Sequence, residues 1–166
     1  DADLDNLTGD VAEMLGSMHK PTASIVIGGG HSIGIPIAVS CGRSFIVPSA
    51  TMTIHPVRTS GTILGVPQAF AGLEKMQNRI SRFIVGHSGI TEEALSRLTF
   101  RTDEMATDVG TIIDGNEAVD CGLIDEIGGL HQAISWLKNK AREEKEHGEA
   151  AGAENSGKTS EASGRD

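Results

Sequence analysis

The sequence predicts an α/β fold, and three observations lead to that class. Short apolar segments alternate along the chain with longer segments of helical periodicity, as strands alternate with helices in α/β proteins. The 21 glycines among 166 residues suit the many tight turns of such a fold better than a helical bundle. Aromatic residues make up only 3% of the chain, so aliphatic side chains and alanine have to fill the core.

The first third of the chain predicts two helices and three strands. Apolar residues recur at helical spacing near the N-terminus, which predicts a helix with one apolar stripe of Val11, Met14, Leu15 and Met18. Lys20-Pro21 ends this helix because proline lacks the N–H that a helix interior requires. The elements that follow are a strand over 22–28, a helix over about 32–41, and short strands over 44–47 and 51–54.

The remainder of the chain is dominated by helices. The longest covers about 66–86, with Pro67 in its first turn, and the next is capped by Thr91. We expect a polar connection over 101–114, a short helix over 117–121, a strand over 123–127 and a last helix over about 130–145. Residues 146–166 contain almost no large apolar side chain, which predicts a disordered acidic tail beside a folded domain of residues 1–145.

Composition excludes several classes of function. A net charge of −9 argues against a nucleic-acid partner, which needs a basic surface. No apolar run approaches the roughly 20 residues of a membrane-spanning helix. Cys41 and Cys121 lie far apart in apolar surroundings, so we expect two free thiols, no metal site and a reducing, cytoplasmic setting. Association of such a cytoplasmic protein with a membrane surface is the alternative.

The stretch Gly30-His31-Ser32-Ile33-Gly34 is the strongest candidate for catalysis. It joins a predicted buried strand to a predicted helix, and a serine between glycines on such a turn exposes its hydroxyl. The amides that follow, beginning with Ile33, face any negative charge that develops there. The glycines at 28–30 lack the Lys-Ser/Thr of a phosphate loop and the G-x-G-x-x-G spacing, so no nucleotide or other cofactor is expected.

A nucleophilic serine needs a base, and His55 is the best placed of the six histidines. It ends an apolar strand and precedes Pro56, which restricts its backbone to an extended conformation. His31 is interpreted as a turn residue that points away from Ser32. The remaining histidines lie in or beside polar helical segments, where we expect them to be solvated.

The carboxylate that orients the histidine is left open by the sequence. Asp103, Asp108, Asp114 and Asp125 are available. Asp108 lies in an irregular stretch that could return toward His55, whereas Asp114 is typical of a helix cap and Asp125 of a structural position in a strand. Asp108 is therefore the candidate for the third catalytic residue.

Several motifs, taken together, are specific. They are Gly28-Gly29-Gly30-His31-Ser32-Ile33-Gly34, Thr51-Met52-Thr53-Ile54-His55-Pro56-Val57-Arg58, Gly65-Val66-Pro67-Gln68, Glu117-Ala118 and Gly122-Leu123-Ile124-Asp125. Between about residues 10 and 138 the chain resembles the ClpP family of serine peptidases, and most of all a translocation-enhancing branch of that family. In most ClpP proteins one residue separates the histidine from the proline, whereas His55 and Pro56 are adjacent here, as in that branch.

The resemblance implies a ClpP/crotonase-like fold of repeated ββα units, with Ser32 as nucleophile, His55 as base and the Ile33 amide as an oxyanion donor. The helix over 66–86 would correspond to the handle that packs ring against ring, so a homo-oligomeric ring is expected. Expected substrates are peptides or unfolded proteins, handled with or without an ATPase or export machinery. Counting back from Gly122 places Gly110 where the family has its aspartate, two residues after Asp108.

The family also has a strand and a Gly-Gly motif that supply an oxyanion amide, and these should precede Asp1. We therefore expect an N-terminally truncated fold in which the activity of this chain is reduced, because one oxyanion donor is worth on the order of 100- to 1000-fold in rate. A non-catalytic scaffold that assists pre-protein translocation is the alternative function. An α/β-hydrolase esterase would need its base late in the chain, where only His131 and His147 stand. Crotonase relatives bind acyl-CoA without a serine–histidine pair, so the pair argues against them.

Overall fold

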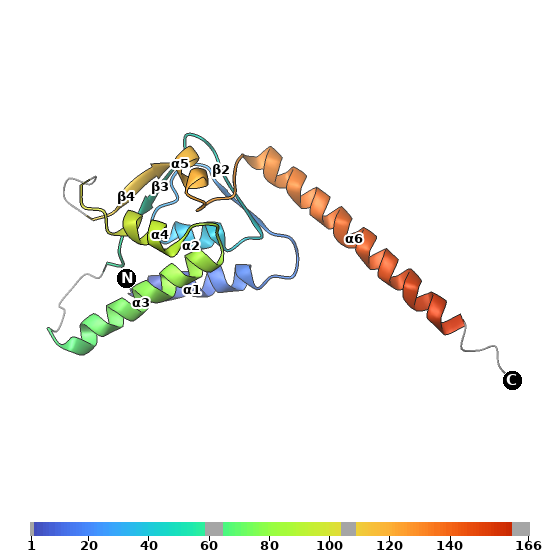
Figure 1. The fold of residues 1–166 in the computed structure, drawn as a ribbon, viewed down its shortest axis with the longest axis horizontal. Coiled ribbons are helices and arrows are strands. Elements are labelled where there is room, and N and C mark those ends of the chain that lie inside the picture. The colour runs from blue at the N-terminus through green and yellow to red at the C-terminus, as the bar shows by residue number, and fades with distance from the viewer. Residues whose placement is uncertain (1, 59–64, 104–108, 161–166) are drawn as a thin grey trace.

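The computed structural model describes residues 2–58, 65–103 and 109–160, with side chains described from residue 9 to residue 146 of these ranges. Two small β-sheets and the helix α5 lie together, the helices α1 to α4 lie on one side of them, and α6 projects away from this body (Figure 1). The mixed α/β class predicted from the sequence is confirmed. The order of elements around the first turns, strand–helix–strand–strand–helix, also agrees with the prediction.

The larger sheet is parallel and has the strand order β1-β2-β5. It consists of β1 (Ala23–Val26), β2 (Arg43–Ile46) and β5 (Glu126–Ile127). Ala23 pairs with Arg43 and Phe45 with Glu126 in this register. The crossover from β1 to β2 contains α2 (Gly34–Val39), and parallel neighbours require such a crossover. The strand expected over 123–127 is therefore shorter than predicted, because only its last two residues pair with β2.

The second sheet pairs β3 (Thr51–Ile54) with β4 (Thr111–Asp114) in antiparallel register, so that Thr51 lies opposite Asp114. The expectation of a polar connection throughout 101–114 was wrong at its C-terminal end. In β4, Thr111 and Ile113 are buried while Ile112 and Asp114 are exposed, the alternation of a half-buried strand. Four residues are too few for this alternation to be distinguished in the sequence, and the partner strand is about sixty residues away.

The core lies where the two sheets meet the helices. Its largest fully buried side chains come from α2, β2, β3 and the segment before β5, and they are Val39, Phe45, Ile46, Met52, Leu123 and Ile124. All but Phe45 are aliphatic, as the composition predicts. Burial of each such side chain contributes about 1.5–3 kcal/mol relative to its exposure. The side chains on both flanks of the turn between β1 and α2 are thus held in a packed interior.

The helices before β4 were located correctly. Besides α2, they are α1 (Ala2–Gly16), α3 (Pro67–Gly86) and α4 (Glu92–Thr99), and the Thr91 hydroxyl accepts a hydrogen bond from Ala94 N at 3.2 Å. The apolar stripe predicted for the first helix does not face the body, because Val11 and Met14 of α1 and Met18 after it are exposed, while Ala12 is buried. On α3, Phe70 near the N-terminus is 61% exposed and Ile84 near the C-terminus is buried. The helix is therefore packed only at its C-terminal end, and its other end projects (Figure 1).

Two further helices follow β4. The first, α5 (Gly115–Asp120), begins with a capping box in which Asp114 accepts from Glu117 N and Glu117 accepts from Asp114 N. The second, α6 (Leu130–Ser160), continues through most of the range for which the composition predicts disorder. Ala and Glu, which are frequent in that range, are strong helix formers. The division into a domain of residues 1–145 and a tail stays a prediction.

Candidate active site

The segment between β1 and α2 lies along β3. The carbonyl of Gly28 accepts a hydrogen bond from Thr51 N at 2.9 Å, and Gly30 N donates to Thr51 O at 2.8 Å. Ser32 N then donates to Thr53 O at 3.0 Å. This ladder, which includes a parallel bridge between Gly29 and Thr51, fixes Ser32 relative to the strand that leads to His55.

Ser32 adopts a left-handed backbone conformation, with φ of 51°, as no other non-glycine residue of the described ranges does. Such a conformation costs on the order of 1–3 kcal/mol and persists only where the surroundings enforce it. Hydrogen bonds from Gly34 N to His31 O and from Ile35 N to Ser32 O close the turn on its far side and lead into α2. Position 30 is closely packed, because an added Cβ would lie 3.1 Å from Val26 Cγ1 and 3.2 Å from Met52 Cε, and these side chains would have to shift.

The main-chain N–H of Ile33 is the candidate oxyanion donor. Ile33 lines the same cavity as Ser32, and its N–H donates no hydrogen bond to another group in the part of the chain that the structure describes. An unpaired amide directly after an exposed serine hydroxyl is the donor that an oxyanion requires.

His55 directly follows β3, and its ring is oriented by the main chain. Nδ1 lies 2.7 Å from the carbonyl oxygen of Pro56, which can only accept, so Nδ1 carries the proton in this arrangement. Nε2 is then the unprotonated nitrogen and has a lone pair for a proton from a hydroxyl group. A residue that holds one nitrogen in this way selects the tautomer needed by a general base.

Ser32, Ile33 and His55 line one cavity of about 280 Å³. Apolar side chains from α3 and α4, including Ile80, Phe83 and Leu95, form part of its wall. Within the described ranges no hydrogen bond joins the Ser32 hydroxyl to the His55 ring. Catalytic hydrogen bonds are often long before substrate binds, so the shared cavity is the informative observation.

Three of the four aspartates considered from the sequence have structural partners. Asp103 pairs with Arg101, whose Nε lies 2.7 Å from Oδ1, and the guanidinium lowers the pKa of this carboxyl. Asp114 caps α5. Asp108 lies outside the described residues. Gly110, two residues after Asp108, is described and contacts the histidine, because a Cβ added there would lie 2.9 Å from His55 Cβ.

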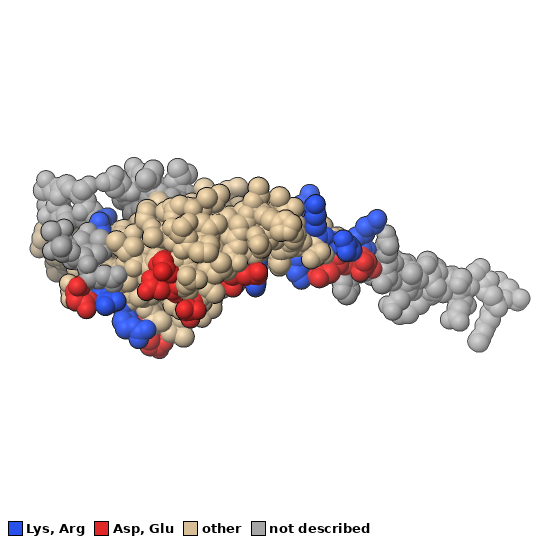
Figure 2. All heavy atoms as spheres, turned by 90° about the horizontal axis from the view of Figure 1, so that it is seen from above, with Lys and Arg blue, Asp and Glu red and all other residues tan. Residues whose placement is uncertain are grey.

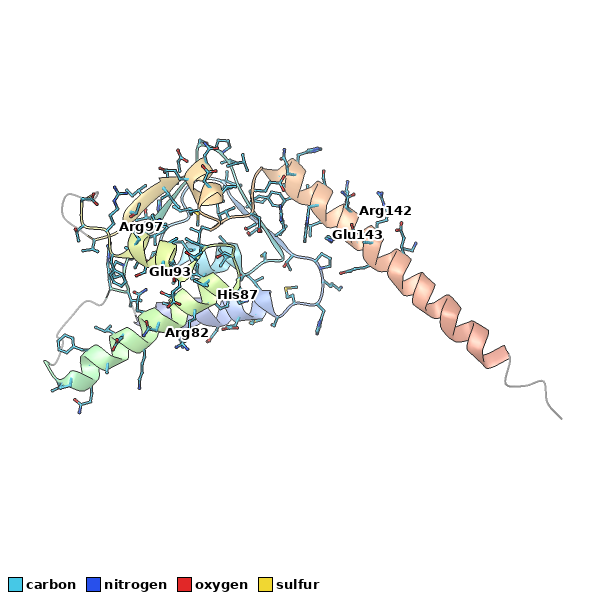
Figure 3. The ribbon with its side chains drawn as sticks, in the orientation of Figure 1. Arg82, His87, Glu93, Arg97, Arg142 and Glu143 are labelled. Atoms are coloured by element: carbon cyan, nitrogen blue, oxygen red, sulfur yellow. The ribbon has the colours of Figure 1, made fainter. Side chains whose placement is uncertain are left out.

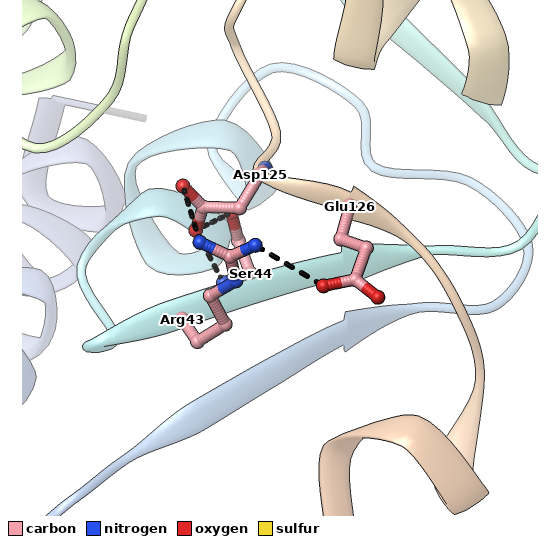
Figure 4. Close-up of polar contacts among 4 residues, drawn as sticks. All are labelled: Arg43, Ser44, Asp125 and Glu126. Carbon is pink, nitrogen blue, oxygen red and sulfur yellow. Dashed lines mark hydrogen bonds and ion pairs between the residues drawn. The ribbon is translucent and has the colours of Figure 1, made fainter. Parts of the chain in front are cut away.

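Asp125 belongs to a network that joins β2 to the segment before β5 (Figure 4). Its Oδ2 accepts hydrogen bonds from Ser44 N at 2.7 Å and from Ser44 Oγ at 2.8 Å. Asp125 N donates to Ser44 Oγ at 3.0 Å, and Arg43 lies 3.9 Å from Oδ1. Asp125 is not among the residues that line the cavity with His55, so its position is structural, as the sequence indicates.

Among the side chains that the structure describes, the other titratable groups give no sign of a second catalytic centre. His87 lies at the C-terminal end of α3 (Figure 3). Its ring stacks on that of Phe83, and its Nδ1 lies 2.8 Å from the carbonyl oxygen of the same residue. Burial raises the pKa of the free thiols Cys41 and Cys121, which makes both poor nucleophiles. The described residues contain no group of three metal-ligating side chains. On the face seen in Figure 2, Lys and Arg lie beside Asp and Glu rather than in a continuous basic surface.

Two contributors to the site were missed by sequence reasoning. His31 was interpreted as a bystander in the turn, but its Nδ1 lies 2.7 Å from Thr53 Oγ1. The carbonyl of Pro56 was not considered at all, because a main-chain acceptor leaves no trace in residue type. The glycine two positions before His31 was a signal that could have been used, since the His31 ring occupies the space a side chain would need there.

Comparison with known proteins identifies the family. The Clp protease family matches residues 8–131, a range that contains both the Ser32 turn and His55. This chain belongs to the Clp protease family. The α/β ClpP-like fold predicted from its motifs is thereby confirmed. In the described ranges, the Clp protease chain has no helix that combines the length and apolar character needed to span a bilayer.

One curated relative is similar over most of the chain. It is the translocation-enhancing protein TepA of Halalkalibacterium halodurans, which is 49% identical over 140 residues. The match includes 81% of this chain and 55% of the relative, so the chain spans about half the length of that protein. The similarity to TepA agrees with the branch of the family indicated by the sequence.

Proposed function

We propose that this protein is a serine endopeptidase of the ClpP type, which hydrolyses peptide bonds through an acyl-enzyme. The observation that carries the proposal is the convergence of Ser32, the Ile33 amide and His55 on one cavity. Membership of the Clp protease family supports it independently. Peptides or unfolded proteins are the proposed substrates, and a homo-oligomeric ring with an ATPase or export partner is the proposed assembly.

In the proposed reaction the Ser32 hydroxyl attacks the carbonyl carbon of the scissile peptide bond while His55 Nε2 accepts its proton. The carbonyl π electrons move to oxygen, and the Ile33 N–H donates to the resulting oxyanion. The C–N bond then breaks as the imidazolium returns the proton to the leaving amine. A water molecule, deprotonated by His55, releases the acyl group from Ser32 by the same steps in reverse.

Asp108 is proposed as the carboxylate that stabilises the imidazolium. Support comes from Gly110, which contacts His55 two residues further along the chain. The Pro56 carbonyl already orients Nδ1 of His55, so the added effect of a carboxylate would be to stabilise the positively charged imidazolium.

A fluorophosphonate probe tests the nucleophile, because it reacts with activated serine hydroxyls. We expect one adduct in the full-length protein, located on Ser32 by peptide mass spectrometry and lost in Ser32→Ala. Ser40 provides the matched control, because its hydroxyl is held by Ile37 O away from the cavity. Labelling elsewhere, or labelling that persists in Ser32→Ala, would show that the assignment is wrong.

A non-catalytic scaffold that assists pre-protein translocation is the second candidate function. The observation that favours it is the similarity to TepA, whose name describes enhancement of translocation rather than cleavage. The two functions differ in their dependence on Ser32. In a secretion assay, Ser32→Ala would abolish the contribution of a peptidase and would leave the contribution of a scaffold unchanged.

A further inference from the structure

Thr53 holds the turn that carries Ser32 at two points. Its main-chain oxygen accepts the hydrogen bond from Ser32 N at 3.0 Å. Its side-chain Oγ1 lies 2.7 Å from Nδ1 of His31, the residue directly before the serine. Thr53 also precedes His55 by two residues, so its side chain leaves β3 on the same face as that of His55. One residue therefore connects the turn of the nucleophile to the strand of the base.

The ring of His31 is confined on its other side by Gly29. A Cβ added to Gly29 would overlap the ring, with Cδ2 only 2.6 Å away and Cε1 3.1 Å away. Contacts shorter than 3.0 Å do not occur for real Cβ atoms, so no side chain fits at position 29 while the ring stays in place. His31 is exposed to solvent, but its orientation is fixed by Thr53 and by the bare backbone of Gly29.

The backbone of Ser32 requires such restraint. Its φ of 51° is unfavourable for a residue with a side chain, and relaxation to an ordinary conformation would redirect the hydroxyl. The hydrogen bonds from Gly30 N and Ser32 N restrain the chain through its amides. Within the described residues, the contact between His31 and Thr53 is the one side-chain hydrogen bond that restrains this turn.

We propose that His31 and Thr53 form a positioning pair that holds Ser32 in its left-handed conformation, in register with His55. This inference rests on the proposed role of Ser32 as nucleophile. The pair acts through the backbone and takes no part in proton transfer with the substrate. His31 thus has a function in this site beyond that of a turn residue.

The test compares the rate at which a fluorophosphonate labels Ser32 in four variants of the full-length protein. His31→Ala and Thr53→Val each remove the hydrogen bond and should slow the maximal labelling rate roughly tenfold, the scale of one lost hydrogen bond. The probe concentration at half-maximal rate should stay within about twofold, because the cavity wall is unchanged. His31→Asn and Thr53→Ser keep a polar atom at the same position and should restore most of the rate.

Two further comparisons distinguish positioning from general loss of stability. The double variant His31→Ala/Thr53→Val should be no slower than either single variant, because both remove the same interaction. His131→Ala is the matched control, since His131 is an exposed histidine on α6 and is not among the residues that line the cavity. It should label at the rate of the unmodified protein.

Amide hydrogen exchange provides a readout that does not depend on activity. If the pair restrains the turn, exchange at Ser32 N–H should become roughly tenfold faster in His31→Ala, while exchange in β2 stays unchanged. Unaltered labelling and unaltered exchange in His31→Ala would overturn the positioning role and leave the peptidase proposal intact. Absence of labelling in the unmodified protein would overturn the peptidase proposal. The exchange rate of the Ser32 N–H in His31→Ala would then be the measurement that tests the positioning role.

Discussion

Replacement of Asp125 by alanine tests the distinction between structural and catalytic carboxylates. The carboxylate accepts two hydrogen bonds from Ser44, one from the main-chain N–H and one from the hydroxyl, and Ser44 itself is buried. A hydrogen bond to a charged group contributes about 1.5–3 kcal/mol, and a buried donor left unpaired costs a similar amount. The Asp125 side chain is 38% exposed, so solvent compensates part of this loss.

We therefore expect Asp125→Ala to reduce the free energy of unfolding by about 2–3 kcal/mol. The ion pair with Arg43 adds little, because its closest atoms are 3.9 Å apart and both side chains are more than one third exposed. Urea unfolding at a fixed protein concentration measures the change as a lower midpoint with an unchanged slope. For a domain of this size the shift corresponds to a melting temperature lower by about 4–12 °C.

Glu126→Gln is the matched control for Asp125→Ala. Glu126 is the next residue and also contacts Arg43, at 3.1 Å, but on the exposed surface, so its replacement should cost less than about 1 kcal/mol. Below the unfolding transition, Asp125→Ala should label at Ser32 as fast as the unmodified protein. A stability loss under about 0.5 kcal/mol would refute the estimate from the hydrogen bonds. A stable variant that fails to label would instead place Asp125 in the catalytic machinery.

Three other predictions follow from the site and its surroundings. Gly110→Ala should destabilise the protein, because φ of 136° suits only glycine, and it should slow labelling of Ser32, because the new methyl group would contact His55. Urea unfolding measures the first effect and the labelling rate measures the second. Asp108→Asn should lower peptidase kcat at least about tenfold with a small change in KM, and activity equal to that of the unmodified protein would leave the Pro56 carbonyl alone to orient His55. Iodoacetamide should modify Cys41 and Cys121 more slowly in the folded than in the unfolded protein at pH 8, with the difference narrowing as pH rises, because burial raises both thiol pKa values and withholds the thiolate until higher pH. Equal rates in the two states would contradict the burial of these thiols.

Elements marked by local signals in the sequence, such as helix caps and turn residues, could be predicted. Pro67 at a helix start, Thr91 as a cap and glycines around Ser32 gave helices and a turn close to those observed. Strand β4 could not be predicted, because it is stabilised by pairing with a strand about sixty residues earlier in the chain. The exposed apolar stripe of α1 could not be predicted either, because periodicity predicts a helix but does not show which of its faces is buried.

The candidate site was predictable to the extent that residue type determines chemistry. Ser32 and His55 followed from a turn motif and a strand end, and the structure brings both to one cavity. The role of the Pro56 carbonyl and the contact between His31 and Thr53 could not be predicted. Both depend on which groups lie close together in the folded chain, and residue type does not show this. The role of Asp108 stays a prediction, since that residue lies outside the described ranges.

Hydrolysis of a peptide substrate by the full-length protein, measured for Ser32→Ala, His55→Ala and the double variant, tests most directly whether the two residues act as one unit. Because a nucleophile without its base and a base without its nucleophile lose the same pathway, all three variants should lose kcat by at least about a thousandfold and to a similar degree. A double variant markedly slower than both single variants, or a His55→Ala variant that retains full activity, would contradict the account.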